Sequence, residues 1–367
     1  MLCSDDTSIV VASGTKLVVV STSTGTVQTT TTLSAAALAV HAALGYLAVG
    51  TDDKRLHLYQ LPACTLVTSI DILKRCASLV ITEVDGQVQV LVADKFAEVW
   101  AYPVSDQMKS RAFILQHPTS SITQMRVVPS LGKIFTSDQD EKIRVSHFPA
   151  AHVVSNYCLG HTAIVSSIDV MLVGSFPVLV SGGGDGTLRS WDPTTGVLLH
   201  TIEFGVTLQK RGRDSAEADQ KDIDPKKDTD QNDEHSGAVV TAVTCSTQIR
   251  AVTFAVVHEG KSNVQVVDID ENGKMVLRSE MQLDGTVVGM IQVQSATHVA
   301  HVDGEGIFHW SHSEPTAVAR ALDSLDLPPC ESHNVSASAP RGERVRERQE
   351  EAALQEDAKR KKIKVEE

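Results

Sequence analysis

Short apolar stretches separated by polar turns run along most of the chain. Residues 17–20 (LVVV) and 88–93 (VQVLVA) are rich in Val and Leu, which favours strands buried between other layers. In the most regular stretch, residues 179–192 (LVSGGGDGTLRSWD), Asp185 is followed six residues later by Trp191. This spacing is typical of a tight turn that leads into a strand.

The same pattern recurs at a nearly constant period. In the better copies its turn position falls at Asp53, Asp94, Asp140 and Asp185. These positions advance by 41, 46 and 45 residues. Weaker copies have their turn position at Gly14, Lys261 and Gly304. A repeat of this length is typical of a four-stranded propeller blade, so the sequence predicts an all-β fold, a WD-repeat β-propeller with seven blades.

The repeats predict one propeller over residues 1–325. An acidic insertion at about 209–237 has almost no apolar side chains, and we expect it to be disordered. Residues 315–325 are expected to form one last strand. Either that strand completes the blade that closes the ring, or residues are missing from the start of the sequence. Residues 326–367 are expected to form a linker and a charged, lysine-rich tail.

The net charge of −13 bears on the binding of nucleic acid. Residues 210–234 contribute −3 and residues 341–367 contribute +1, which leaves about −11 for the ring. A protein that held RNA mainly through its own phosphate contacts would carry a broad basic surface. We therefore expect any affinity for nucleic acid to come from a local patch, from the tail or from a partner.

The cysteines and the tail indicate the compartment. The six cysteines include no C-x-x-C pair, no secretory leader opens the sequence, and no apolar run is long enough to span a membrane. These features predict a reducing compartment and no membrane association. The basic cluster at 359–364 is typical of a nuclear-localisation signal, of an RNA phosphate contact or of a merely solubilising tail. We expect the nucleus.

One set of polar residues resembles a catalytic triad. His161, Ser181 and Asp185 would suit acyl transfer, but His161 precedes Asp185 by 24 residues and Trp191 follows. In propeller blades this spacing is typical of a buried hydrogen-bond network, and we predict that structural role. The preceding repeat is expected to contain a partial copy with its own His, Thr and Asp, namely His117, Thr136 and Asp140.

Other candidate sites are weaker. The glycines around Asp185 lie between two strands, without the following helix of a phosphate-binding loop. His309 and His312 alone are not a metal site, so no metal and no cofactor are predicted. Residues 140–144 (DEKIR) alternate in charge along a turn and strand. An exposed Arg144 on that strand would be a good anchor for a carboxylate of another protein, although such a strand is more often simply solvated.

Several stretches resemble one family, the WD-repeat non-catalytic subunit of the tRNA guanine-N7 methyltransferase. They include TSDQDEKIRVSHF (136–148), CLGHTAIVSSIDV (158–170), SGGGDGTLRSW (181–191), LVADKFAEVWAY (91–102) and DDKRLHLY (52–59). The resemblance covers roughly residues 45–200.

The resemblance implies a seven-bladed propeller without an active site. Such a subunit forms a heterodimer with a separate S-adenosylmethionine-dependent catalytic subunit, which forms N7-methylguanosine in the variable loop of tRNA. The propeller would bind, stabilise and orient that enzyme, and it would contact tRNA indirectly or through the C-terminal tail. The resemblance places the partner surface at Arg144, with Lys142, Glu141 and Asp140 beside it and Lys95 in the neighbouring repeat.

Two other functions remain open from the sequence. The chain could be a WD-repeat adaptor that binds peptides, in a ubiquitin ligase or a chromatin factor, because the fold hosts many functions. A hydrolase that uses His161, Ser181 and Asp185 is the third hypothesis.

Overall fold

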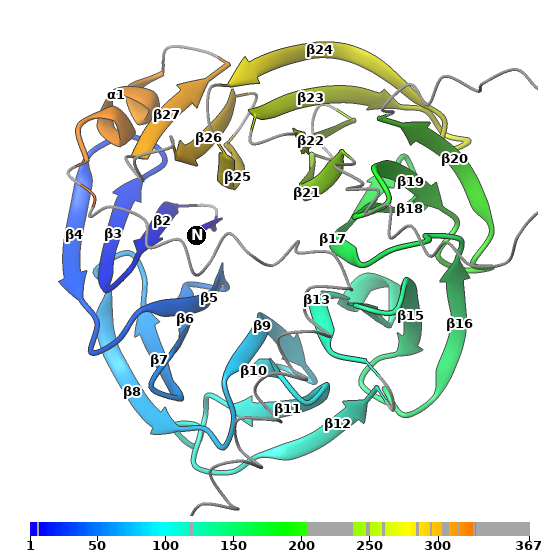
Figure 1. Ribbon diagram of the computed structural model, residues 1–367. Helices are drawn as coiled ribbons and strands as arrows, with labels where there is room; N and C mark the ends of the chain where they lie inside the picture. The colour runs from blue at the N-terminus through cyan, green and yellow to red at the C-terminus, as the bar shows by residue number, and fades with distance from the viewer. Residues whose placement is uncertain are drawn as a thin grey trace, which may run out of the picture.

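The computed structural model describes residues 1–5, 7–117, 120–204, 238–246, 250–258, 261–283, 286–293, 296–302, 308–313, 316–325 and 327. They form a ring of antiparallel sheets around a central channel, as in a propeller (Figure 1). The predicted insertion, the basic cluster and all of the predicted linker and tail except Leu327 lie outside the described residues.

Each sheet is built from strands that are consecutive in the chain and run from the channel to the rim. The first two sheets contain β1 (Leu2–Ser4), β2 (Ser8–Ser13), β3 (Lys16–Ser21), β4 (Val27–Thr32), β5 (Ala37–Ala43), β6 (Tyr46–Thr51), β7 (Arg55–Gln60) and β8 (Thr65–Asp71). The third contains β9 (Cys76–Val84), β10 (Gln87–Asp94), β11 (Glu98–Pro103) and β12 (Ala112–Gln116).

The remaining sheets continue the pattern. The fourth and fifth contain β13 (Ile122–Val128), β14 (Lys133–Asp138), β15 (Lys142–His147), β16 (Val154–Leu159), β17 (Val165–Val173), β18 (Phe176–Gly183), β19 (Thr187–Trp191) and β20 (Leu198–Glu203), with a short 3-10 helix at Pro129–Leu131. The sixth contains β21 (Val239–Ser246), β22 (Ala251–His258), β23 (Lys261–Ile269) and β24 (Met275–Leu283). The last contains β25 (Thr286–Val293), β26 (Ala296–Val302) and β27 (Phe308–His312).

Apolar side chains between neighbouring sheets form the core. Val10 and Val19 of the first sheet pack in one cluster with Leu47 and Val49 of the second, and none of the four is exposed. The middle strands are buried on both faces, which explains why they read as continuous apolar stretches rather than alternating ones. The predicted strands at 17–20 and 88–93 are confirmed as β3 and β10.

The blade count needs a correction. Six sheets have four strands, as the repeat length predicts, but the last has three strands among the described residues. The prediction of seven four-stranded blades is therefore wrong: the described chain forms six such blades and one three-stranded sheet.

The segment after β27 is a helix, not the strand predicted at 315–325. Helix α1 (Ala317–Asp323) begins at the N-cap Thr316, whose hydroxyl accepts a hydrogen bond from the backbone N–H of Ala319. This cap and the run of Ala and Leu favour a helix. Val318 and Leu322 pack in a buried cluster with apolar residues of β2 and β3, so the helix joins the last sheet to the first (Figure 1).

In the second to fifth blades, the turns between the second and third strands are spaced regularly. One residue of each turn has a positive φ: Lys54 at 63°, Ala97 at 65°, Glu141 at 72° and Gly186 at 70°. These positions advance by 43, 44 and 45 residues, more evenly than the aspartates do. Asp94 ends strand β10, three residues before Ala97, so its structural equivalent is Asp138 and not Asp140.

Adjacent blades are joined by side chains that accept hydrogen bonds from the next inner strand. The backbone N–H groups of Ile81, Met125, Ile168, Val243 and Cys245 donate, in that order, to His41 Nδ1 (3.2 Å), Ser78 Oγ (3.1 Å), Gln124 Oε1 (2.6 Å), Ser167 Oγ (3.1 Å) and Asp169 Oδ2 (2.8 Å). Each donor lies on the edge of its sheet, where no further strand can pair with it. These bonds fix each blade relative to the next.

Replacement of Leu322 by Ala tests the closure through α1. Leu322 is fully buried, so we expect its truncation to lower the free energy of unfolding by about 2 to 4 kcal/mol. Urea unfolding followed by fluorescence measures the change. Arg320→Ala, on the exposed face of the same helix, is the control and should change it by less than about 0.5 kcal/mol. Equal losses in both variants would show that the helix does not close the ring.

Candidate functional site

The four residues of the predicted structural network form one chain of hydrogen bonds. His161 Nδ1 lies 2.9 Å from Asp185 Oδ2, and His161 Nε2 lies 2.8 Å from Ser181 Oγ. The indole Nε1 of Trp191 donates to the same Ser181 oxygen over 2.8 Å. Ser181 and Trp191 are not exposed at all. Because a substrate cannot reach the Ser181 hydroxyl, this arrangement supports a structural role and gives no support to a hydrolase.

The environment of Asp185 favours its ionised form. Burial alone would raise the pKa of this carboxyl, but hydrogen bonds from His161, Thr162 and Thr187, with the charge of His161, outweigh it and lower the pKa to about 2. The network therefore holds a carboxylate at the turn between β18 and β19, where it fixes the backbone N–H of Thr187.

The fourth blade has a similar network with a different acid. His117 Nε2 lies 2.7 Å from Thr136 Oγ1, as the sequence predicts, but His117 Nδ1 faces Asp138 Oδ2 at 3.3 Å. The prediction of Asp140 as its acid is wrong, because the side chain that points inward is the last one of β14. Asp138 also accepts hydrogen bonds from the backbone N–H groups of Asp140 and Lys142. It thereby fixes the turn that carries the predicted partner residues.

Arg144 is buried, contrary to the expectation of an exposed guanidinium. The residue is 7 % exposed. Its Nε donates to Ser146 Oγ (3.0 Å), its Nη1 to the carbonyl of Gln116 (3.0 Å) and its Nη2 to the carbonyl of Ala151 (3.2 Å). All three partners belong to this chain, so Arg144 joins β15 to β12 and to the loop after β15. Its guanidinium is therefore not available to a partner carboxylate.

The other predicted partner residues lie on turns at one end of the blades. Lys142 and Lys95 are exposed, and Asp140 and Glu141 are partly exposed. Within the described residues neither lysine makes an ion pair with an acidic side chain. The two ammonium groups are therefore free to meet carboxylates of another protein.

Two apolar residues that the sequence analysis missed lie at the same end. Leu73 is 67 % exposed and Phe96 is 64 % exposed, the highest values among the exposed large apolar side chains of the described chain. The Nζ of Lys74 lies 4.2 Å from the centre of the Phe96 ring. Phe96 directly follows Lys95 in the turn after β10. Its position in a turn, where an apolar residue has no core to enter, was the signal in the sequence.

Hydrogen bonds to backbone carbonyls connect these turns into one surface. The N–H of Lys95 donates to the carbonyl of Arg75, the Ser121 hydroxyl donates to the carbonyl of Lys95, and the N–H of Gln139 donates to the carbonyl of Ser121. The surface runs across the second, third and fourth blades. We call it the turn face and define it by Leu73, Lys74, Lys95, Phe96, Asp140, Glu141 and Lys142.

The described residues contain no group of three or more His, Cys, Asp or Glu side chains that could hold a metal ion. No helix in the described part of the chain is long and apolar enough to cross a membrane.

Cys3, Cys64, Cys76, Cys158 and Cys245 are free thiols. Burial raises the pKa of the Cys158 thiol to about 12, with the charge of Asp192 adding to the effect.

A comparison with protein families decides the assignment. Residues 122–318 match the model of the tRNA methyltransferase TRM82 WD40 domain, which is 197 of the 367 residues of the chain. The chain belongs to this family. The resemblance inferred from the sequence motifs is thus confirmed, and the family match extends well beyond residue 200, through β27 and into α1.

Two known proteins illustrate the similarity of the chain to individual relatives. The human tRNA (guanine-N(7)-)-methyltransferase non-catalytic subunit WDR4 is 38 % identical over 166 residues, which is 45 % of this chain and 39 % of the relative. The Xenopus laevis subunit wdr4 is 36 % identical over 158 residues, 43 % of this chain and 39 % of the relative. The matched part of the chain thus spans about two fifths of the length of these relatives.

Solved structures agree with the fold. A chain of the mitotic checkpoint complex gives a TM-score of 0.64 at 12 % identity and covers 82 % of this chain and 83 % of its own. U3-55K gives a TM-score of 0.60 at 15 % identity, with coverages of 81 % and 85 %. At such identities the similarity shows the propeller fold alone.

The lowered pKa of Asp185 predicts that acid reduces the free energy of unfolding of this protein. The folded-state pKa lies below the ordinary 3.8, so the ionised carboxylate contributes stability above about pH 4, and that stability is lost as the pH falls toward 2. We expect this contribution to be about 1 to 2 kcal/mol. Urea unfolding of the wild type and of Asp185→Asn, measured from pH 7 to pH 3, should show a difference that shrinks as the pH falls. A difference that is the same at every pH, or equal to that of the exposed control Asp71→Asn, would contradict this role.

Arg144→Met tests the buried guanidinium. The variant keeps an apolar stem but leaves the carbonyls of Gln116 and Ala151 without their donor, so we expect the free energy of unfolding to fall by about 2 to 4 kcal/mol. Arg55→Met, which removes an exposed ion pair with Asp71, should cost less than about 1 kcal/mol. Urea unfolding compares the two. An Arg144→Met variant as stable as the wild type would contradict the structural role of the guanidinium and favour an exposed side chain.

Proposed function

We propose that this chain is a non-catalytic subunit of a tRNA guanine-N7 methyltransferase complex. It binds, stabilises and orients a separate S-adenosylmethionine-dependent subunit that forms N7-methylguanosine in the variable loop of tRNA. Membership of the TRM82 WD40 family is the observation that carries this proposal. The names of the related human and Xenopus subunits support it, since both are called non-catalytic.

The polar residues of the chain fit a subunit without catalysis of its own. His161, Ser181 and Asp185, which resemble a triad, are bonded to one another in a buried network. The net charge of −13 is unsuited to broad contact with tRNA phosphates, so the partner supplies most of those contacts. The basic cluster at 359–364 remains a proposed route to the nucleus or to tRNA.

The turn face is the surface proposed for the catalytic subunit. It combines exposed apolar groups, Leu73 and Phe96, with two lysines, Lys95 and Lys142, that make no ion pair with a carboxylate of the described chain. A few apolar or aromatic anchors surrounded by charged groups are typical of the energetic centre of a protein interface. The lysines fit acidic residues on the partner, and their exposure suits them to guide its approach and orientation.

Hydrogen bonds hold the turns of this face in a fixed conformation, which suits a subunit that orients its partner. Asp138 holds two backbone N–H groups of the turn at Asp140–Lys142, and Asp94 in the same way holds those of Phe96 and Glu98. Turns fixed in this way lose little conformational entropy when a partner binds. Arg144 supports the face without contacting the partner. Its guanidinium joins β15 to β12 and to the loop after β15, which is a positioning role.

Co-expression with the catalytic subunit of the same organism tests the function and the surface together. We expect the wild-type pair to copurify and to form N7-methylguanosine in tRNA, read out by mass spectrometry of nucleosides. Phe96→Asp should weaken the complex at least tenfold, about 1.4 kcal/mol, because it places a charge in the apolar centre. Lys142→Glu should weaken it in the same direction.

Phe176→Asp is the matched control. Phe176 is 42 % exposed but begins β18, at the opposite end of the blade from the turn face, so the complex should be unaffected. A wild-type chain that neither binds the enzyme nor supports the modification would overturn the function. A stable, active complex with Phe96→Asp as tight as the control would overturn the turn face alone.

A further inference from the structure

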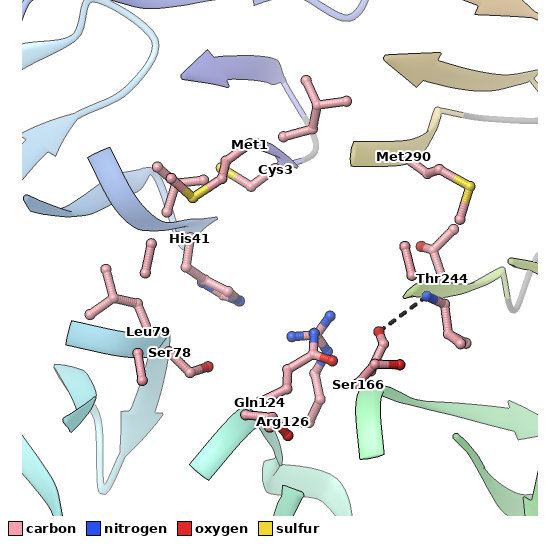
Figure 2. A pocket seen from close by; sticks show the side chains of 18 of the residues that line it. Met1, Cys3, His41, Ser78, Leu79, Gln124, Arg126, Ser166, Thr244 and Met290 are labelled. Atoms are coloured by element: carbon pink, nitrogen blue, oxygen red, sulfur yellow. Dashed lines mark hydrogen bonds between the residues drawn. The ribbon is translucent and has the colours of Figure 1, made fainter. Parts of the chain in front are cut away.

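The channel of the ring contains a cavity of about 570 Å³. It is lined by the inner strands of the sheets, from β1 and β5 round to β25 (Figure 2). Its volume lies within the range of small-molecule sites, roughly 300 to 1,000 Å³. Neither the family assignment nor the turn face gives this cavity a role.

Most polar side chains of the lining are already used between blades. Ser78 and Ser167 accept hydrogen bonds from the next inner strand, and Thr123 and Ser166 donate to carbonyls of their neighbours. These groups hold the ring together. The chemistry of the cavity therefore depends on the lining groups that keep unused hydrogen-bonding capacity.

Three such side chains present N–H donors. The Nδ1 of His41 accepts from Ile81, so the neutral ring carries its proton on Nε2. The Oε1 of Gln124 accepts from Ile168, which leaves its amide NH₂ as a donor. Arg126 donates through Nε to Asp169 and through Nη1 to the carbonyl of its neighbour Met125, which leaves Nη2. No described residue accepts from these remaining donor groups.

The charge of the lining has one sign. Arg126 is the one permanently charged side chain among the described residues that line the cavity. Figure 2 shows its guanidinium and the ring of His41 pointing into the same open space. Burial, with the positive charge of Arg126 as a smaller cause, lowers the pKa of His41 to about 3, so the ring is neutral at physiological pH and acts as a donor without charge.

Asp169 holds Arg126 in place without covering it. Its carboxylate accepts a hydrogen bond from the Nε of Arg126 over 3.2 Å and also accepts from the backbone N–H groups of Val170 and Cys245. Asp169 is a positioning residue that fixes one edge of the guanidinium. The other edge faces a cavity where the remaining N–H donors are Gln124 and His41.

We propose that the channel binds a small molecule that carries a carboxylate or phosphate group, with Arg126 as its anchor and Gln124 and His41 as further donors. An oxyanion offers several acceptor lone pairs and a negative charge, which the donors and the guanidinium of Arg126 complement. The serines and threonines that bond between blades give the rest of the site its shape, and the buried hydroxyl of Thr241, which has no hydrogen-bond partner in the described chain, adds a further polar group to the lining.

Isothermal titration calorimetry on the full chain tests the site. Inorganic phosphate and succinate are titrated separately at one ionic strength, which distinguishes a phosphate from a carboxylate as the preferred group. We expect saturable binding of at least one. Gln124→Glu should weaken that binding at least tenfold, because it keeps the oxygen that accepts from Ile168 but replaces the amide donor by a negative charge.

Arg126→Gln should abolish the binding, and Gln60→Glu is the matched control. Gln60 is exposed at the end of β7, so that variant adds the same charge away from the channel and should bind as the wild type does. Because Gln124→Glu preserves the bond between blades, the test does not depend on the folding of the Arg126 variant. No saturable binding of either anion, or equal binding by Gln124→Glu and Gln60→Glu, would overturn the proposal. Neither result would count against the proposed complex with the methyltransferase.

Discussion

The ring depends on how the free edges of its inner strands are satisfied. Each inner strand pairs with a neighbour on one side, and the backbone N–H groups on its other side face the channel and the next blade. In six places along the described chain a side chain of the preceding blade accepts from such an N–H group, from His41 at one end of the series to Ser262 at the other. Unpaired donors there would be costly in the partly buried interior. The requirement forces polar side chains into the narrowest part of the ring.

This requirement also shapes what the channel can do. A side chain that accepts through one atom is fixed in orientation, and its other polar atom is then presented to the cavity. Gln124 and His41 both follow this rule, since their acceptor atoms bind the next blade and their donor atoms remain. The same bonds that hold blades together therefore make the channel rich in donors, and Arg126 adds charge to it.

At the ends of the blades, buried polar residues serve the turns rather than chemistry. Asp138 and Asp185 each accept from a histidine and from the backbone of the turn that follows. The turns vary in what they expose, and in the third and fourth blades they expose Phe96, Lys95 and Lys142. A rigid support with variable exposed residues is a general way for a propeller to carry a binding surface.

The sequence by itself determined the repeat, the strands of the regular blades and the network of His161, Ser181, Asp185 and Trp191. These follow from short-range patterns: apolar runs, turn residues and fixed spacings within one blade. The family resemblance was equally visible, because it rests on motifs of a few residues such as those around Asp140 and His161.

Tertiary structure decided the rest. The choice of Asp138 over Asp140 depends on which side chain points inward at the end of a strand. The burial of Arg144 depends on carbonyls at Gln116 and Ala151, which lie on other elements. Helix α1 replaced the expected strand because its apolar residues pack on β2 and β3, far away in the sequence. The turn face and the channel exist only once separate blades are side by side, since no single repeat contains either one.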